Sequence, residues 1–228
     1  MTTTTKTSGI TTLLAALTIS ACATSHPAVQ GPVTPTLNGQ PDAAYVERAR
    51  ADSIRHPYTN ADVEFMSHMI GHHAQAIAMS RWAPTHGASP SVLRLADRII
   101  NAQQDEIATM QNWLRDRLKP VPEANPNGMK MTMNGMEHMM LMPGMLTEAQ
   151  MKELDAARGP EFDRLFLTDM IQHHRGAVSM VRDLFGSYGA GQDETIFKFA
   201  SDVNVDQTTE ITRMEKMLAA INLGITVE

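Results

Sequence analysis

The 228-residue chain contains one cysteine, Cys22, and aromatic residues make up only 5% of it. A single thiol cannot form an intramolecular disulfide. Once Cys22 is lipidated or removed, no thiolate remains for metal binding or nucleophilic attack. The scarcity of aromatic residues disfavours a large β-sandwich and favours helices. The formal net charge of −6 argues against a nucleic-acid-binding protein, because phosphate binding needs a basic face.

Long hydrophobic runs are also missing. The N-terminal apolar stretch, residues 10–19, is too short to span a bilayer as a mature helix. We predict that residues 1–21 are a signal peptide of the lipoprotein type, because "ISAC" resembles the bacterial lipoprotein signal that ends at a lipidated cysteine, here Cys22. Ala21-Cys22-Ala23 also fits a small-x-small cleavage site. Both readings export the chain to the periplasm or cell envelope, and a lipid on Cys22 would be its only membrane contact.

The remaining chain divides at proline, glycine and capping signals. Thr59-x-x-Asp62 is typical of a helix N-terminus, as is Ser89-Pro90. Pro160 begins the corresponding helix of the second half. The predicted parts are a flexible tether with a short helix (22–58), a first helical hairpin (59–118), a methionine-rich connecting loop (119–150) and a second helical hairpin (151–228).

The two hairpins carry the same motif, D-x2-F-x3-M-x2-H-H-x2-A-x2-M. It begins at Asp62 in the first half and at Asp163 in the second. The helices that follow also match, with Glu106 corresponding to Glu210. Neither hairpin can bury its apolar stripe alone, so the pattern predicts an all-α protein. We expect a four-helix bundle with pseudo-twofold symmetry, built from two repeated helical hairpins.

The spacing of the motif directs histidines toward the bundle interior. His72 and His73 lie on either side of the helical stripe that contains Met69, so both can lean inward. The symmetry brings the second pair toward them, and four imidazoles would then share one interior. The candidate metal ligands of the motif helices are His72, His73, His173, His174, Met69, Met79, Met170 and Met180. The alternative is ordinary core packing, with the imidazoles hydrogen-bonded to neighbouring side chains.

Five acidic residues are candidates for holding the histidines in place. Asp169 lies four residues before His173, a spacing that suits a carboxylate–imidazole pair. Two others begin the motif helices, where the helix dipole alone also favours an acid. The candidates are Asp62, Asp163, Asp169, Glu106 and Glu210.

Methionine is concentrated between the hairpins, where eight of the seventeen residues from Met129 to Met145 are methionine. Thioether sulfur is soft and suits Cu(I), and it remains a ligand where thiols form disulfides. A hydrophobic cover for the bundle or a protein-binding surface would also explain such a segment. Glycine and proline disfavour a long helix there. The candidate ligands are Met129, Met131, Met133, Met136, His138, Met139, Met140, Met142 and Met145.

The repeated motif resembles the bacterial family known as domain of unknown function 305, over about residues 60–222. The resemblance implies a ferritin-like four-helix bundle that is usually exported. It also implies copper binding, since some members are periplasmic copper-binding proteins. The family's positions carry over as Met69, His72, His73, Met79, Met170, His173, His174 and Met180.

These observations predict an exported protein that sequesters or handles copper, as Cu(I), through the histidine pairs and the methionine-rich loop. One alternative is a structural or interaction lipoprotein without metal. The weaker one is a ferritin-like di-iron oxidase, which needs Glu-x-x-His sequences that the motif helices lack. No nucleophile–base set, phosphate loop or dinucleotide motif is present, so we expect no enzyme activity and no organic cofactor. Metal ions are the expected partners, and a homo-oligomer is compatible with the pattern.

Overall fold

The helices begin at the capping residues that the sequence predicts. Thr59 caps α2 with a complete capping box, and Thr147 does the same for α4. Proline occupies the first turn of both α3 and α5. The computed structural model describes residues 1–2, 36–37, 40–55, 57–133 and 136–225. Its helices are α1 (Ala43–Arg55), α2 (Asn60–Trp82), α3 (Pro90–Asp116), α4 (Glu148–Ala156), α5 (Pro160–Gly186) and α6 (Glu194–Asn222).

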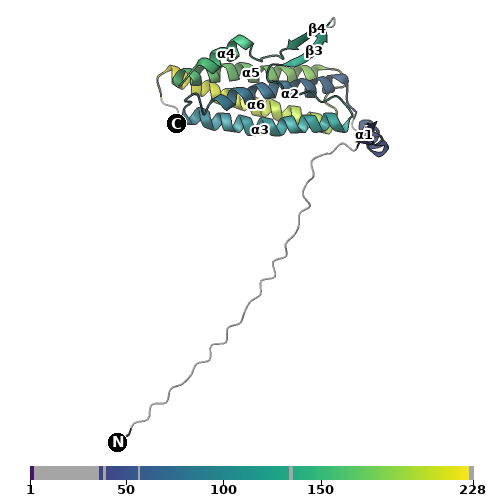
Figure 1. Ribbon diagram of the computed structural model, residues 1–228, viewed down its shortest axis with the longest axis horizontal. Coiled ribbons are helices and arrows are strands. Elements are labelled where there is room, and N and C mark those ends of the chain that lie inside the picture. The colour runs from purple at the N-terminus through teal and green to yellow at the C-terminus, as the bar shows by residue number, and fades with distance from the viewer. Residues whose placement is uncertain (3–35, 38–39, 56, 134–135, 226–228) are drawn as a thin grey trace. The chain divides into compact units, whose positions relative to one another are not determined.

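Four long helices form the bundle, and they run side by side in Figure 1. Helices α2 and α3 make one hairpin, α5 and α6 make the other, and the hairpins meet chiefly where α2 contacts α5. The buried apolar side chains fall into two clusters, one around Met69, Leu114 and Phe199 and the other around Ile99, Phe166 and Met214. The prediction of an all-α bundle from two hairpins is confirmed.

The segment between α3 and α4 contains a β-hairpin. Strands β3 (Met129–Met133) and β4 (Met136–Met140) pair antiparallel, with Met131 opposite His138. Asn-Gly at 134–135 is a strong sequence signal for a two-residue hairpin turn, and it could have revealed these strands within the predicted loop. A second, two-residue pairing joins β1 (Thr36–Leu37) to β2 (Gln40–Pro41). Figure 1 shows α4 and the β3–β4 hairpin on the same side of the bundle.

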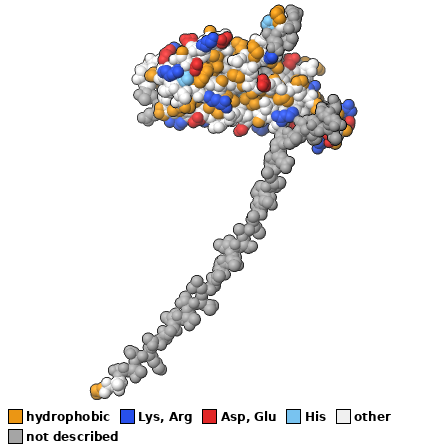
Figure 2. Space-filling view, viewed as in Figure 1, with side chains coloured by type: hydrophobic (Ala, Val, Ile, Leu, Met, Phe, Trp, Pro, Cys, Tyr) orange, Lys and Arg blue, Asp and Glu red, His pale blue; other side chains and the backbone are white. Residues whose placement is uncertain are grey.

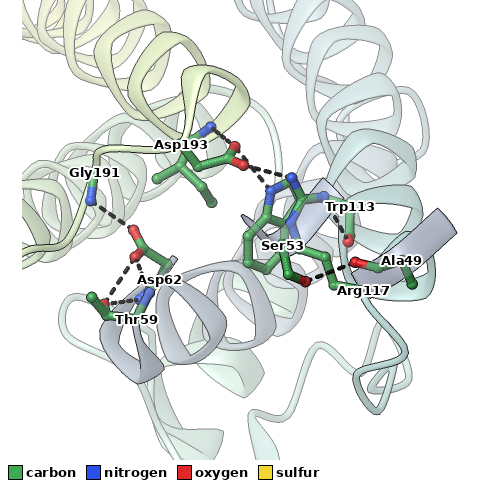
Figure 3. A network of polar contacts seen from close by, with 9 residues as sticks. Ala49, Ser53, Thr59, Asp62, Trp113, Arg117, Gly191 and Asp193 are labelled. Carbon is green, nitrogen blue, oxygen red and sulfur yellow. Dashed lines mark hydrogen bonds and ion pairs between the residues drawn. The ribbon is translucent and has the colours of Figure 1, made fainter. Parts of the chain in front are cut away.

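Polar contacts join the two hairpins at one end of the bundle (Figure 3). Asp62, on the first hairpin, accepts a 2.7 Å hydrogen bond from the backbone amide of Gly191 in the α5–α6 loop. Asp193, which caps α6, accepts hydrogen bonds from Trp113 at 3.1 Å and from Arg117 at 2.5 Å. Each half therefore holds the end of the other through a buried carboxylate.

No helix among the described residues is long and apolar enough to cross a bilayer. On the face shown in Figure 2, acidic and basic side chains are interspersed among apolar ones. The predicted signal peptide beyond residue 2, the lipidation site Cys22 and residues 23–35 of the tether lie outside the described residues.

Candidate metal centre

The two histidine pairs of the repeat meet where α2 packs against α5. All four side chains are fully buried, at 0% exposure. The inner pair, His72 and His173, lies ring beside ring, with centroids 3.8 Å apart and planes inclined by 39°. Successive residues on a helix point about 100° apart, so His73 and His174 turn toward the neighbouring helices. The structure thus brings together four imidazoles, which we call the histidine quartet.

The outer pair of the quartet contacts the repeat-related glutamates on α3 and α6. His174 Nε2 donates to Oε2 of Glu210 at 2.7 Å. His73 Nε2 lies 2.6 Å from Oε2 of Glu106, although the contact lacks the angles of a hydrogen bond. Glu106 and Glu210 are mostly buried, with side-chain exposures of 20% and 21%. Each hairpin therefore contributes one imidazole–carboxylate pair.

Every ring of the quartet has an Nδ1 atom without a protein partner. His72 Nε2 bonds to the carbonyl oxygen of Pro143 at 3.0 Å, and because a carbonyl only accepts, Nε2 of the neutral ring carries the proton. Its Nδ1 then presents a lone pair. Neither nitrogen of His173 has a partner with the geometry of a hydrogen bond, although an interaction with the His72 backbone slightly raises its pKa. A buried polar atom without a partner costs about 1–3 kcal/mol, so several in one place indicate a ligand site.

The two inner rings are neutral. Burial is the main cause that lowers the pKa of His72 to about 3, and the neighbouring His73 lowers it further. Burial and the adjacent His72 hold the pKa of His173 well below its usual range. Neutral imidazole is the form that binds metal, so both rings are ready to act as ligands at neutral pH.

The donor chemistry of the quartet fits copper, since imidazole nitrogen and thioether sulfur are both copper ligands. Across the described ranges, however, no three His, Cys, Asp or Glu side chains are arranged to hold a metal ion. The free nitrogens of the quartet therefore do not converge on one ion in this arrangement.

Methionines from the motif lie on both sides of the quartet. Met69 and Met180 belong to one apolar cluster, whereas Met79 and Met170 belong to the other. Three of them are fully buried, and Met180 is 8% exposed. The histidines thus form a polar layer between two methionine-containing apolar layers.

The methionine-rich segment has an exposed part and a buried part. In the β3–β4 hairpin, Met131, Met136 and Met139 are exposed, at 37%, 61% and 45%, and His138 is exposed as well. At the base of the hairpin, Met129 is paired with Met140, and both pack against the apolar core. Met133 is paired with Met136 in the strand register.

Beyond the hairpin, Met142 and Met145 are buried, each at 5% exposure. The backbone amide of Met142 contacts the sulfur of Met145 at 3.3 Å. Pro143, between them, accepts the hydrogen bond from His72. The end of the segment therefore lies directly against the quartet.

Four residues that the sequence interpretation did not single out lie against the connecting segment 119–150. Gln75 bonds to the carbonyls of Pro126 and Leu146 at 3.0 and 3.1 Å, and accepts from the Leu146 amide at 2.6 Å. Gly176, at the equivalent position of α5, leaves room for the backbone of Pro143. Gly71 and Gln172 form a second unequal pair, and each also touches the segment. A departure from the repeat at these positions is the signal that could have identified them.

The two aspartates that begin the motif do not contact the histidines in the structure. Asp62 bonds to Thr59 and Gly191, and Asp163 accepts from the backbone amide of Ser89 at 3.1 and 3.2 Å. Ten residues separate Asp62 from His72, which is about 15 Å along a helix. The prediction that Asp62 and Asp163 hold the imidazoles in place is therefore wrong. The two carboxylates instead join the ends of the two hairpins.

Asp169 does not form the expected pair with His173, whose ring nitrogens both lack partners. The His173 ring lies against His72, whereas Asp169 is buried on α5 at 8% exposure. Burial and the nearby Glu153 raise the pKa of Asp169 to about 6. Asp169 is thus a partly desolvated acid away from the imidazoles.

The fold and the centre define a class: four-helix bundles of two repeated hairpins with buried histidine pairs facing each other. Residues 62–218 match the family model described as Domain of unknown function (DUF305), and the chain belongs to this family.

Solved structures of the same family resemble the chain. A Streptomyces coelicolor protein, described as secreted, is 30% identical with a TM-score of 0.59, covering 74% of this chain and 96% of its own. A Deinococcus radiodurans fragment is 27% identical with a TM-score of 0.58, and the match covers 72% of this chain and 98% of the fragment. CopM in its Cu(II)-bound form is 29% identical with a TM-score of 0.53, covering 69% and 95%.

An uncharacterised protein of Acanthamoeba polyphaga mimivirus is 39% identical over 56 residues. That match covers 25% of this chain and 37% of the viral protein.

Proposed function

We propose that the protein binds copper in the cell envelope, sequestering it or passing it on, and that the histidine quartet is its principal site. The observation that carries this proposal is the set of four buried Nδ1 atoms without protein partners, on rings of which the inner two are neutral. Structural hydrogen bonding alone does not account for His173, because neither of its nitrogens has a partner with the geometry of a hydrogen bond and an interaction with the His72 backbone only weakly offsets the effect of burial on its pKa.

The likeness to CopM supports the choice of metal. Structures of CopM contain Cu(I), Cu(II) or silver, and each is 27–29% identical to this chain. Cu(I) suits the neighbouring thioethers, and Ag(I) is a convenient probe of the same kind of site because it is soft and does not cycle between oxidation states under ordinary conditions. We propose binding rather than catalysis, and export with a lipid on Cys22 as its anchor.

The exposed hairpin contributes a second set of donors. Met131 lies opposite His138 in the strand register, so a thioether and an imidazole share one face of the ribbon. This face is open to solvent, whereas the quartet is fully buried. We propose that the hairpin collects the metal with lower affinity than the quartet.

The test is a titration of the full-length chain with Ag(I), and with Cu(I) in competition with a chromophoric chelator. His173→Phe is the informative variant because it removes two nitrogens that have no partner with the geometry of a hydrogen bond, and it disturbs only the weak interaction with the His72 backbone. We expect metal uptake at the quartet to fall at least tenfold in affinity while thermal stability stays equal or rises.

His86→Gln is the matched control. His86 is also buried, but its ring is hydrogen-bonded to Thr85 and Asp155. The His86→Gln variant should therefore lose stability but still bind the metal. If His173→Phe binds as tightly as the unaltered chain, the quartet is not the copper site.

The second candidate is a bundle without metal. The hydrogen bonds from His72 to Pro143 and from His174 to Glu210 favour it, because they give two of the four rings a structural partner. It predicts no uptake of Ag(I) or Cu(I) above that of a mild chelator, by the unaltered chain or by any variant.

A further inference from the structure

A small pocket lies beside the quartet, and its lining is rich in metal-binding side chains. It has a volume of about 210 Å³ and is formed by α2, α5 and the end of the methionine-rich segment. Its chemically active lining residues are Glu64, His68, Met142, Met180 and Asp183.

The donors in this pocket are mostly soft. His68 is half-buried on α2, while Met142 and Met180 are nearly buried, at 5% and 8% exposure. One imidazole and two thioethers form a ligand set that binds Cu(I) and Ag(I) in preference to hard cations. Glu64 and Asp183 are exposed at the rim, where their charge favours a cation near the pocket.

His68 has no counterpart in the repeat, since the equivalent position of the second half is Asp169. Packing symmetry therefore does not require an imidazole at this position. Met142 is likewise outside the repeat, because it belongs to the segment that joins the hairpins. Two of the three donors, His68 and Met142, therefore fall outside the repeat.

The pocket shares a wall with the quartet. Pro143 lines the pocket, and its carbonyl oxygen accepts the hydrogen bond from His72. His68 also lies one helical turn before His72 on the same side of α2. Moving the Pro143 backbone aside would free His72 Nε2 and open the pocket to the buried rings.

We propose that this pocket is an outer site for a monovalent soft metal cation, held by His68, Met142 and Met180, from which the cation passes to the quartet. This inference rests on the proposed copper-binding function. It adds a site, a ligand set and an access route to it.

The experiment is a titration of the full-length chain with Ag(I), followed by NMR of ¹³C-labelled methionine methyl groups. Met142→Leu and Met180→Leu assign the two signals and each removes one ligand. Met217→Leu is the control, since Met217 is equally buried at 5% but lies in the other apolar cluster. His68→Asn removes the imidazole at a half-buried position that is not part of the core.

In the unaltered chain we expect Ag(I) to shift the Met142 and Met180 methyl signals together. His68→Asn should abolish these shifts and reduce the binding by one equivalent, whereas His173→Phe and Met217→Leu should retain them. Shifts that persist in His68→Asn would overturn the proposal. So would a chain that takes up Ag(I) at the quartet without moving either methyl signal. No uptake of Ag(I) at any site would overturn the copper-binding function as well.

Discussion

At the scale of single residues, the cost of the centre is visible in its hydrogen bonds. Four buried imidazoles leave five ring nitrogens, all four Nδ1 atoms and His173 Nε2, without a protein partner, even when the short contact of His73 with Glu106 is counted as a partner. A core of leucine or phenylalanine would be cheaper to bury. Under the proposed function, a bound cation would satisfy lone pairs that the protein leaves open.

Asp169 offers a residue-scale prediction about pH. Its pKa is raised from 3.8 to about 6, so between these values the folded state binds a proton that the unfolded state has released. Stability therefore falls as pH rises through this window, and the penalty is fully present at pH 7. Asp169→Asn should raise the free energy of unfolding by about 1–2 kcal/mol at pH 7.5 and leave it unchanged near pH 4.

Urea unfolding at both pH values measures this effect. Asp105→Asn, at an exposed aspartate of α3, is the control and should be neutral at either pH. A destabilised Asp169→Asn at pH 7.5 would mean that the carboxylate makes a favourable contact.

At the scale of elements, the motif helices differ where the connecting segment docks on them. Gln75 on α2 reaches out to hold Leu146, while its counterpart Gly176 on α5 lets Pro143 come close. Because of this difference, α2 binds the segment through side-chain hydrogen bonds, whereas α5 leaves space for its backbone. As a result, the carbonyl of Pro143 reaches His72 and closes the centre on this side.

Gly176→Ala tests this arrangement. An added Cβ would lie 1.9 Å from the Pro143 carbonyl oxygen, a clash with backbone that cannot be relieved by a side-chain rotation. We expect a loss of about 1–3 kcal/mol in unfolding free energy, as for other overpacked sites, together with displacement of the segment. Gly186→Ala, in the last turn of the same helix, meets nothing within 4 Å and should gain up to about 1 kcal/mol. Equal effects of the two changes in denaturant titrations would refute the docking argument.

At the scale of the whole molecule, the hairpins are joined by reciprocal braces at their ends. Asp62 of the first hairpin bonds to Gly191 of the second, and Asp163 of the second bonds to Ser89 of the first. These bonds fix how far one hairpin slides along the other. The positions of the two inner rings depend on the same displacement, because His72 and His173 face each other across the α2–α5 contact.

Asp62→Ala should cost about 2–3 kcal/mol, because it removes the N3 carboxylate from the capping box of α2 and leaves the buried Gly191 amide without a partner. Thr147→Ala is the control: it breaks a capping box of the same type on α4, at its N-cap residue instead of its N3 residue, and Thr147 makes no contact between the hairpins that the structure describes. It should cost about 1 kcal/mol or less. Chemical denaturation of both variants gives the difference, and identical losses would mean that the Gly191 bond contributes nothing.

Much of this architecture was predictable because its causes are local. Helix starts depend on neighbouring residues, as at the caps Thr59 and Thr147 and at the prolines that open α3 and α5. The repeat of Asp62 as Asp163 can be read directly from the sequence. The strands of the methionine-rich segment were missed because methionine has no strong preference for a strand. Asn-Gly at 134–135 is the turn signal at that position, and it is typical of a two-residue hairpin.

The sequence alone determined that two equivalent helices would each present adjacent histidines to a shared interior, since helical periodicity places them there. Tertiary structure decided which histidine of each pair meets its counterpart and which one meets a glutamate, because two side chains 100° apart cannot both face the same helix. It also decided that Asp62 and Asp163 brace the hairpins and that Pro143 closes over His72. These contacts join residues far apart in the chain, and their geometry exists only once the hairpins have packed together.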